Sequence, residues 1–181
     1  MTANVHAMVD LETLDVKATG VIMSIGAVAF DPMGNEMGEK FYHVISIDDC
    51  LKHGLTTSPD TLKWWLKQSP EAQGVMHEAK ATSATLEDAL SAFSVWWKAN
   101  KLKYLWGNGA AFDNAMLSYA YTRTSIEQPW VCWNDLCFRT LKNLNSEVPA
   151  TPRHGTYHNA LDDAITQAYW CQAIFKSWQQ E

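Results

Sequence analysis

The chain has 181 residues, of which 47% are hydrophobic and 19% are charged, so its composition is that of a globular protein and not of a disordered one. This length fits one domain with a substantial buried core, and we expect residues 1–181 to form it. The net charge of −6 and the lack of a Lys/Arg cluster argue against broad binding to duplex nucleic acid. The same charge balance does not exclude a small nucleic-acid site in which bound metal ions supply the positive charge.

The cysteines and the first residues predict the cellular compartment. No apolar run is long enough for a membrane span, and the start of the chain lacks the basic and apolar regions of a secretory signal. We therefore expect a cytoplasmic protein whose cysteines are reduced thiols. The only closely spaced pair, Cys132 and Cys137, does not have the spacing of a common zinc motif.

The first half of the chain predicts three strands and then two helices. Apolar segments at 5–11, 20–31 and 39–47 are typical of strands, and a turn rich in glycine makes 20–47 a hairpin. Ser58 followed by Pro59 is a strong signal for the start of a helix. A second helix is predicted at 85–99, where apolar residues recur at helical spacing.

The second half of the chain predicts alternating strands and helices. A short strand at 103–109 runs into glycines and is followed by a helix at 110–123. The segment 130–141 reads as a strand and then a helix capped by Asn134 or Asp135, and a helix covers about the last 20 residues. This order predicts an α/β fold with a mixed sheet, antiparallel in its first three strands and parallel later, flanked by helices.

Asp10 and Glu12 lie two residues apart at the end of the first predicted strand, so their carboxylates share one face of the sheet. The simpler interpretation is a polar strand end that meets solvent. Two features favour a functional site. Acids at the end of a buried strand lie where α/β proteins bind ligands, and the nearest following basic residue is Lys17. Two carboxylates without a cation repel one another unless a divalent metal binds them.

Asp113 is a third candidate acid. It follows the glycines after the fourth strand and lies in the first turn of the next helix, where an acid commonly serves only as a cap. Phe112 beside it could be a stacking surface or part of the core, and we favour the core.

The segment "HNALDD" contains His158 and two adjacent acids, Asp162 and Asp163. At about 100° per residue, Asp163 lies at the border of the apolar stripe of the last helix, whereas Asp162 lies nearly opposite the stripe and is expected to face solvent. His158 can act with Asp163 only if it precedes the helix, on the loop that contains Gly155. A loop histidine beside carboxylates is a candidate general base, although a surface histidine without a role is also consistent with the pattern.

Taken together, "DLET", "NGAAFDN" and "HNALDD" resemble the three motifs of the DEDDh 3′–5′ exonucleases, the DnaQ-like group with an RNase H-like fold. The order of the motifs is the same, and the resemblance extends from residue 10 to about residue 175. Two further segments, "TLKWWLKQSPEAQ" and "CWNDLCFRTL", resemble a single-domain branch that includes phage exodeoxyribonucleases and bacterial exoribonucleases.

This resemblance implies a single 3′–5′ exonuclease domain over residues 1–181 and assigns its catalytic residues. Asp10, Glu12, Asp113 and Asp163 would bind two divalent cations, Mg²⁺ or Mn²⁺, which prefer oxygen ligands. His158 would deprotonate the attacking water, and the product would be a nucleoside 5′-monophosphate released from the 3′ end.

The resemblance also implies contacts with a nucleic-acid 3′ end, from Thr13 and Leu14 just past the first motif. Phe112 and one of Trp64 and Trp65 are candidate stacking surfaces, with Trp65 preferred, because base stacking tolerates any sequence. The tryptophan segment favours single-stranded DNA. A 3′–5′ exoribonuclease is the first alternative, and a non-catalytic nucleic-acid-binding module on the same fold is the second. A purely structural domain ranks last because it leaves four uncompensated carboxylates unexplained.

Overall fold

The computed structural model describes residues 5–179 and is built around one five-stranded sheet in the order β3-β2-β1-β4-β5. Its strands are β1 (His6–Thr13), β2 (Ile22–Phe30), β3 (Met37–Val44), β4 (Tyr104–Gly107) and β5 (Asp135–Cys137). β1, β2 and β3 pair antiparallel, whereas β4 pairs parallel to both β1 and β5. The mixed α/β sheet predicted from the order of the elements is confirmed.

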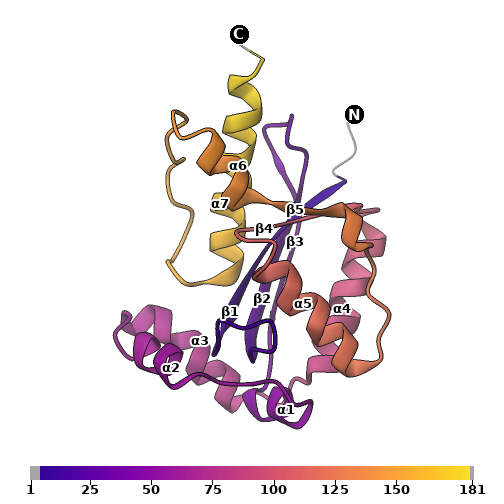
Figure 1. Cartoon of the computed structure of the whole chain (residues 1–181), viewed down its shortest axis with the longest axis vertical. Coiled ribbons are helices and arrows are strands. Elements are labelled where there is room, and N and C mark those ends of the chain that lie inside the picture. The colour runs from indigo at the N-terminus through magenta and orange to yellow at the C-terminus, as the bar shows by residue number, and fades with distance from the viewer. Residues whose placement is uncertain (1–4, 180–181) are drawn as a thin grey trace.

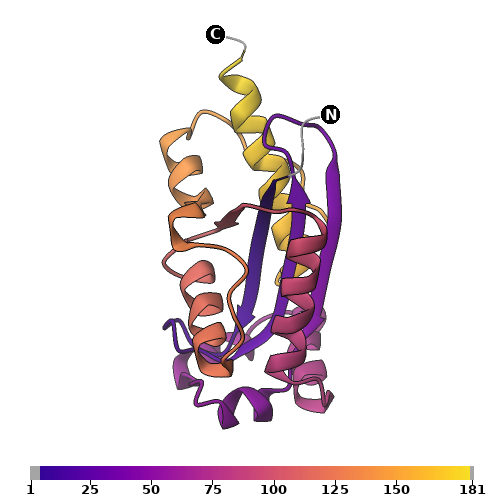
Figure 2. The same cartoon turned by 90° about the vertical axis from the view of Figure 1, so that its right-hand side faces the viewer.

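Helices cover both faces of the sheet (Figure 1). α7 (Ala160–Ser177) packs on β1 and β2 on one face, and α4 (Leu86–Ala99) and α5 (Asp113–Thr124) lie on the other. Figure 2 shows the sheet between these layers. All nine residues of β2 are consequently buried, as expected for a strand that is covered on both sides.

Four further helices complete the described part of the chain. They are α1 (Ile47–Lys52), α2 (Pro59–Trp65), α3 (Pro70–Ala81) and α6 (Phe138–Leu144). Ser58 caps α2 as predicted, since its hydroxyl accepts a hydrogen bond from the Thr61 N–H. α1 and α3 were not predicted, although Ser69 and Pro70 start α3 with the same Ser-Pro signal. No helix within residues 5–179 is both long enough and apolar enough to cross a membrane.

The predicted cap of the helix after β5 is wrong. α6 begins after Cys137, whereas Asn134 ends a single 3₁₀ turn and Asp135 is the first residue of β5. The carboxylate of Asp135 accepts hydrogen bonds from Asn114 and Trp130, so it holds strand β5 against α5 and does not cap α6.

Gly26 in β2 determines how closely α7 approaches the sheet. A Cβ atom at this position would lie 2.1 Å from the backbone of Ala160, the first residue of α7. Gly26 pairs with Asp10 across the β1–β2 ladder. The start of α7 can therefore lie directly on the sheet beside Asp10 only because residue 26 has no side chain.

Candidate active site

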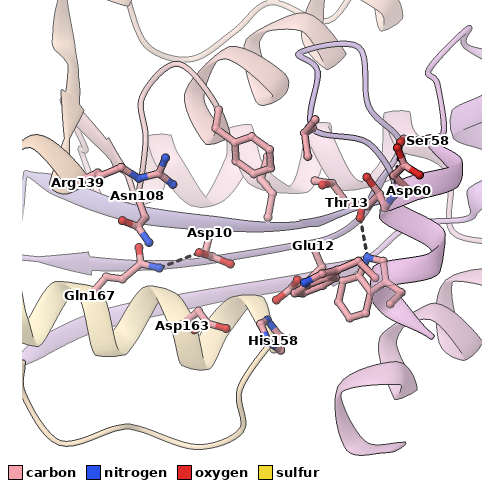
Figure 3. Close-up of a pocket in the computed structure, with 16 residues that line it drawn as sticks. Asp10, Glu12, Thr13, Ser58, Asp60, Asn108, Arg139, His158, Asp163 and Gln167 are labelled. Carbon is pink, nitrogen blue, oxygen red and sulfur yellow. Dashed lines mark hydrogen bonds between the residues drawn. The ribbon is translucent and has the colours of Figure 1, made fainter. Parts of the chain in front are cut away.

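The carboxyl end of β1 opens into a cavity of about 680 Å³. Asp10 and Glu12 line it from β1, as the spacing in the sequence predicts, and α2, the turn after β4, the start of α6 and α7 supply the other walls (Figure 3). The lining side chains include both acidic and aromatic groups: Asp10, Glu12, Asp60, Asp163, Trp64, Trp65 and Phe112.

α7 brings Asp163 and Gln167 to the same cavity (Figure 3). Asn159 caps the helix by accepting hydrogen bonds from the N–H groups of Leu161 and Asp162, so that Asp163 lies in the first turn. One turn later, Gln167 donates a hydrogen bond of 2.7 Å to Asp10 Oδ1. This bond joins the last helix to the first strand at the centre of the site.

Asp113 lies under the cavity and not on its lining. It is the first residue of α5 and is only 2% exposed, and backbone N–H groups of Leu11 and Asn108 donate to its carboxylate. Its negative charge contributes to raising the pKa values of Asp10 and Glu12. The structure therefore brings the three predicted segments together, with Asp113 as the most deeply placed of the four acids.

Burial and mutual repulsion disturb the ionisation of these acids. Burial, followed by the charges of Asp113, Glu12 and Asp163, raises the pKa of Asp10 well above its usual range. Burial, followed by the charges of Asp163 and Asp113, raises the pKa of Glu12 to about 8. Burial alone raises the pKa of Asp113 to about 7. Near neutral pH the metal-free site therefore retains protons that a cation would displace.

The cavity has the chemistry of a site for divalent cations. Ligand atoms of Glu12, His158 and Asp163 all lie within 4.8 Å of one another. The side-chain oxygens of Asn108 and Gln167 are buried at the cavity without a hydrogen-bond partner among residues 5–179. Closely spaced carboxylates and unsatisfied oxygens suit hard divalent ions such as Mg²⁺ and Mn²⁺.

His158 lies on the loop before α7, as the predicted role requires (Figure 3). Its backbone has φ +60°, a left-handed conformation that is uncommon for residues other than glycine. Its ring makes T-shaped contacts with Trp64 and Trp65, at 5.0 Å and 6.1 Å between ring centroids. The two tryptophans of α2 therefore fix one side of the imidazole.

Comparison with known proteins identifies the family. The Rv2179c-like 3′–5′ exoribonuclease domain matches residues 5–175, nearly the whole chain. The chain belongs to this family. It is a 3′–5′ exonuclease, and the exonucleases whose acidic motifs it resembles generally use divalent metal ions. A comparison with curated proteins gave no match.

Solved structures of nucleases share the fold of this exonuclease. The nuclease domain of 3′hExo, a DEDDh family member bound to rAMP, superimposes with a TM-score of 0.66 at 14% identity, covering 97% of this chain and 94% of that one. Exonuclease X in complex with 5′ overhanging duplex DNA gives 0.57 at 17% identity, covering 95% and 92%. E. coli Exonuclease I in complex with a dA16 oligonucleotide gives 0.64 at 15% identity, covering 97% of this chain and 41% of that one. At these identities the likeness shows the RNase H-like fold.

The prediction that Asp162 of this exonuclease faces solvent is wrong. Its carboxylate accepts a hydrogen bond of 2.8 Å from the Thr156 N–H and lies 3.8 Å from His154 Nε2. A helical wheel counts only the helix itself, whereas here the loop before α7 folds back over the far side of the first turn. Gly155, at φ +58°, makes this return possible, because a Cβ there would lie 2.1 Å from Asp162 Oδ2.

The predicted substrate contacts of the exonuclease occupy different environments. Thr13 and Phe112 line the cavity, although Phe112 also packs against the main core. Leu14 is 2% exposed, belongs to the core and is not part of the lining. Trp65 lies at the cavity wall but is 1% exposed, and its indole N–H donates to the Thr13 carbonyl at 2.8 Å. Trp64, its neighbour, is the exposed tryptophan at 43%.

Four polar residues that line the candidate site or pair with one of its acids were not found from the sequence: Asn108, Arg139, Arg153 and Gln167. Gln167 follows Asp163 by one helical turn, a spacing that could have indicated it. Arg139 lies at the cavity against Gly109, and its charge lowers the pKa of Asp113. Arg153 makes an ion pair of 2.5 Å with Asp163. No local pattern marks either arginine, because each is isolated in sequence from the acid on which its charge acts.

Proposed function

We propose that this exonuclease removes nucleoside 5′-monophosphates one at a time from single-stranded 3′ ends, with Asp10, Glu12, Asp113 and Asp163 as ligands of two divalent cations. The observation that carries the proposal is the concentration of four acids from β1, α5 and α7 in and under one cavity, where the charges of their neighbours help to raise the pKa values of Asp10 and Glu12. Four carboxylates match the charge of two divalent ions. When bound, such ions stabilise the attacking and leaving oxygens of an in-line displacement at phosphorus.

His158 is proposed as the general base. Its ring lies near Glu12 and Asp163, as a group that takes a proton from water at the acids must. Trp64 and Trp65 hold the ring in place, and the loop that carries it is tied to α7 through Asp162. These contacts set the distance between the imidazole and the acids.

The terminal nucleotide is proposed to lie between Thr13, Phe112 and Trp64. Trp64 presents an exposed ring at the cavity, so it is better placed for base stacking than Trp65. Trp65 and Leu14 are buried and would not contact the nucleotide; they would hold the end of β1 in position. The hydrogen bond from Trp65 to the Thr13 carbonyl supports this role.

RNA is the proposed polymer, since the matching family is described as an exoribonuclease domain. Single-stranded DNA, which the tryptophan segment favours, is the second candidate. The four free thiols fit a reducing compartment, and we propose that the chain acts in the cytoplasm as one nuclease domain.

The test uses matched RNA and DNA oligonucleotides with a 3′ label. With Mn²⁺ or Mg²⁺ the protein should release labelled mononucleotides, EDTA should stop the release, and Asp10→Ala should abolish it. Faster cleavage of RNA supports the proposed polymer, whereas faster cleavage of DNA selects the second candidate. Binding of both oligonucleotides without cleavage would identify a non-catalytic module and refute the proposed reaction.

A further inference from the structure

Arg153 holds an unusual position for a cation in an acidic site. Its Nη1 donates to Asp163 Oδ1 at 2.5 Å, its Nη2 donates to the Thr156 carbonyl, and its guanidinium lies 4.6 Å from the centre of the Tyr157 ring. The side chains of Arg153 and Asp163 are only 18% and 21% exposed. This is therefore a partly buried, specific ion pair and not a surface contact.

We propose that Arg153 is an internal counter-ion that occupies Asp163 in the metal-free protein and must leave it when a divalent cation binds. The inference rests on the proposed metal-ligand role of Asp163. It concerns a residue outside the proposed set of ligands and base, and it assigns to that residue control over metal affinity.

The charges at the site support this exchange. Without metal, repulsion among the four acids is opposed by the positive charge of Arg153, which also acts on Glu12. Two divalent ions balance four carboxylates, so the guanidinium charge becomes surplus and is repelled when they arrive. Arg153 and an ion near Glu12, His158 and Asp163 would compete for the same carboxylate.

The hydrogen bonds of Arg153 indicate that the ion pair can open. Its Nε is buried and lacks a hydrogen-bond partner among residues 5–179, so the present position leaves one donor of the guanidinium unsatisfied. A guanidinium that moved toward solvent would recover that hydrogen bond from water. Asp162 would still hold the loop through the Thr156 N–H.

The exchange also links the metal site to the proposed base. Arg153 ties Asp163 to the Thr156 carbonyl and to the ring of Tyr157, the residue directly before His158. Release of Arg153 would remove one of the contacts that fix this loop. Metal binding and the position of the His158 backbone are therefore coupled through one side chain.

The test measures Mn²⁺ affinity by titration calorimetry, without nucleic acid. Arg153→Gln is expected to bind Mn²⁺ roughly three- to tenfold more tightly than the wild type, since it lacks the competing charge. Arg153→Lys, which keeps the charge, is expected to bind like the wild type. Lys98→Gln removes one exposed charge from α4, outside the cavity lining, and should leave the affinity unchanged. In an Asp163→Asn background, the gain in affinity from Arg153→Gln should be smaller than in the wild type, because only the action of Arg153 on Glu12 remains.

An equal or weaker affinity of Arg153→Gln would overturn the proposal, because a residue that merely orients Asp163 would weaken binding when it is lost. A structure of the Mn²⁺-bound wild type supplies a second measurement that needs no variant. The Arg153–Asp163 pair should be broken in it, and an intact pair would refute the exchange. A wild type that binds no Mn²⁺ would refute the proposed metal site as well, whereas equal binding by both proteins refutes only the role of Arg153.

Discussion

Adjacent residues Asp162 and Asp163 serve different purposes at the start of α7. Asp163 points into the cavity and pairs with Arg153, whereas Asp162 accepts the Thr156 N–H and supports the loop that carries His158. At the scale of single residues, Asp163 supplies negative charge to the cavity, whereas Asp162 fixes the conformation of the loop through a hydrogen bond. The two roles can be separated by neutral substitutions.

Asp163→Asn is expected to lower kcat by at least about a hundredfold, because an amide cannot replace a carboxylate ligand. Asp162→Asn should lower kcat by less than about fivefold, since the amide oxygen can still accept the Thr156 N–H. Mononucleotide release under saturating Mn²⁺ measures both. A larger loss for Asp162→Asn would place the metal on the other aspartate.

The two tryptophans of α2 allow a similar comparison. Trp65→Ala removes a side chain that is 1% exposed and is expected to cost about 3–5 kcal/mol of unfolding free energy. Trp64→Ala should cost less than about 1.5 kcal/mol, because its ring is half-exposed, but it should reduce activity by freeing His158. Denaturant unfolding and nuclease assays on both variants measure the difference. Equal destabilisation by the two substitutions would contradict the assigned environments.

At the scale of elements, the contact between β2 and the start of α7 determines whether the site can assemble. α7 carries Asp163 and Gln167, and its first residue lies against Gly26. Asp10, the partner of Gly26 across the ladder, receives the hydrogen bond from Gln167. Stability and the proposed metal binding therefore depend on one interface between a strand and a helix.

Gly26→Ala is expected to lower the unfolding free energy by about 1–3 kcal/mol, because the new methyl group would overlap the backbone of Ala160. The same shift of α7 should weaken Mn²⁺ binding by moving Asp163 away from Asp10. Gly74→Ala in α3 is the matched control: no atom lies within 4 Å of the added methyl group, and helix propensity predicts a gain of about 0.5–1 kcal/mol. Thermal melts with and without Mn²⁺ measure both effects, and a Gly26→Ala protein as stable as the wild type would show that α7 does not depend on this contact.

Several elements with strong local signals were predicted from the sequence, whereas α3 was missed although Ser69 and Pro70 give it the same start as α2. The Ser58-Pro59 start of α2, the buried strand β1 and the loop position of His158 all follow from local rules on caps and periodicity. The environments of Asp162 and Arg153 depend on contacts between the first turn of α7 and the loop that folds back over it. Such contacts leave no periodic signal, so they could be found only in the structure.

At the scale of the whole molecule, the acidic site opposes folding when no metal is present. Folded-state pKa values of about 8 for Glu12 and about 7 for Asp113 lie above the unfolded values of 4.5 and 3.8, so the folded protein binds more protons. Stability from these groups is therefore complete at low pH and is lost as the pH rises through the folded-state values.

In EDTA, the unfolding free energy is accordingly expected to fall between pH 5 and pH 8.5 through the contribution of Glu12 and Asp113, both buried at the site. Saturating Mn²⁺ should remove or reverse this trend, because metal binding takes the place of the protons and strengthens as they leave. Denaturant unfolding across this pH range, with and without Mn²⁺, measures the effect. A stability that rises with pH in EDTA in the wild type but not in Glu12→Gln would contradict the assignment.

The left-handed backbone of His158 has a consequence for the evolution and engineering of this enzyme. A residue with a Cβ atom costs about 1–2 kcal/mol in that conformation, whereas glycine adopts it without steric cost. Folding alone would favour glycine at position 158, and the proposed chemistry requires an imidazole. A screen that selects variants of this nuclease for heat resistance alone would therefore favour loss of its proposed base, so such a screen must select for turnover at the same time.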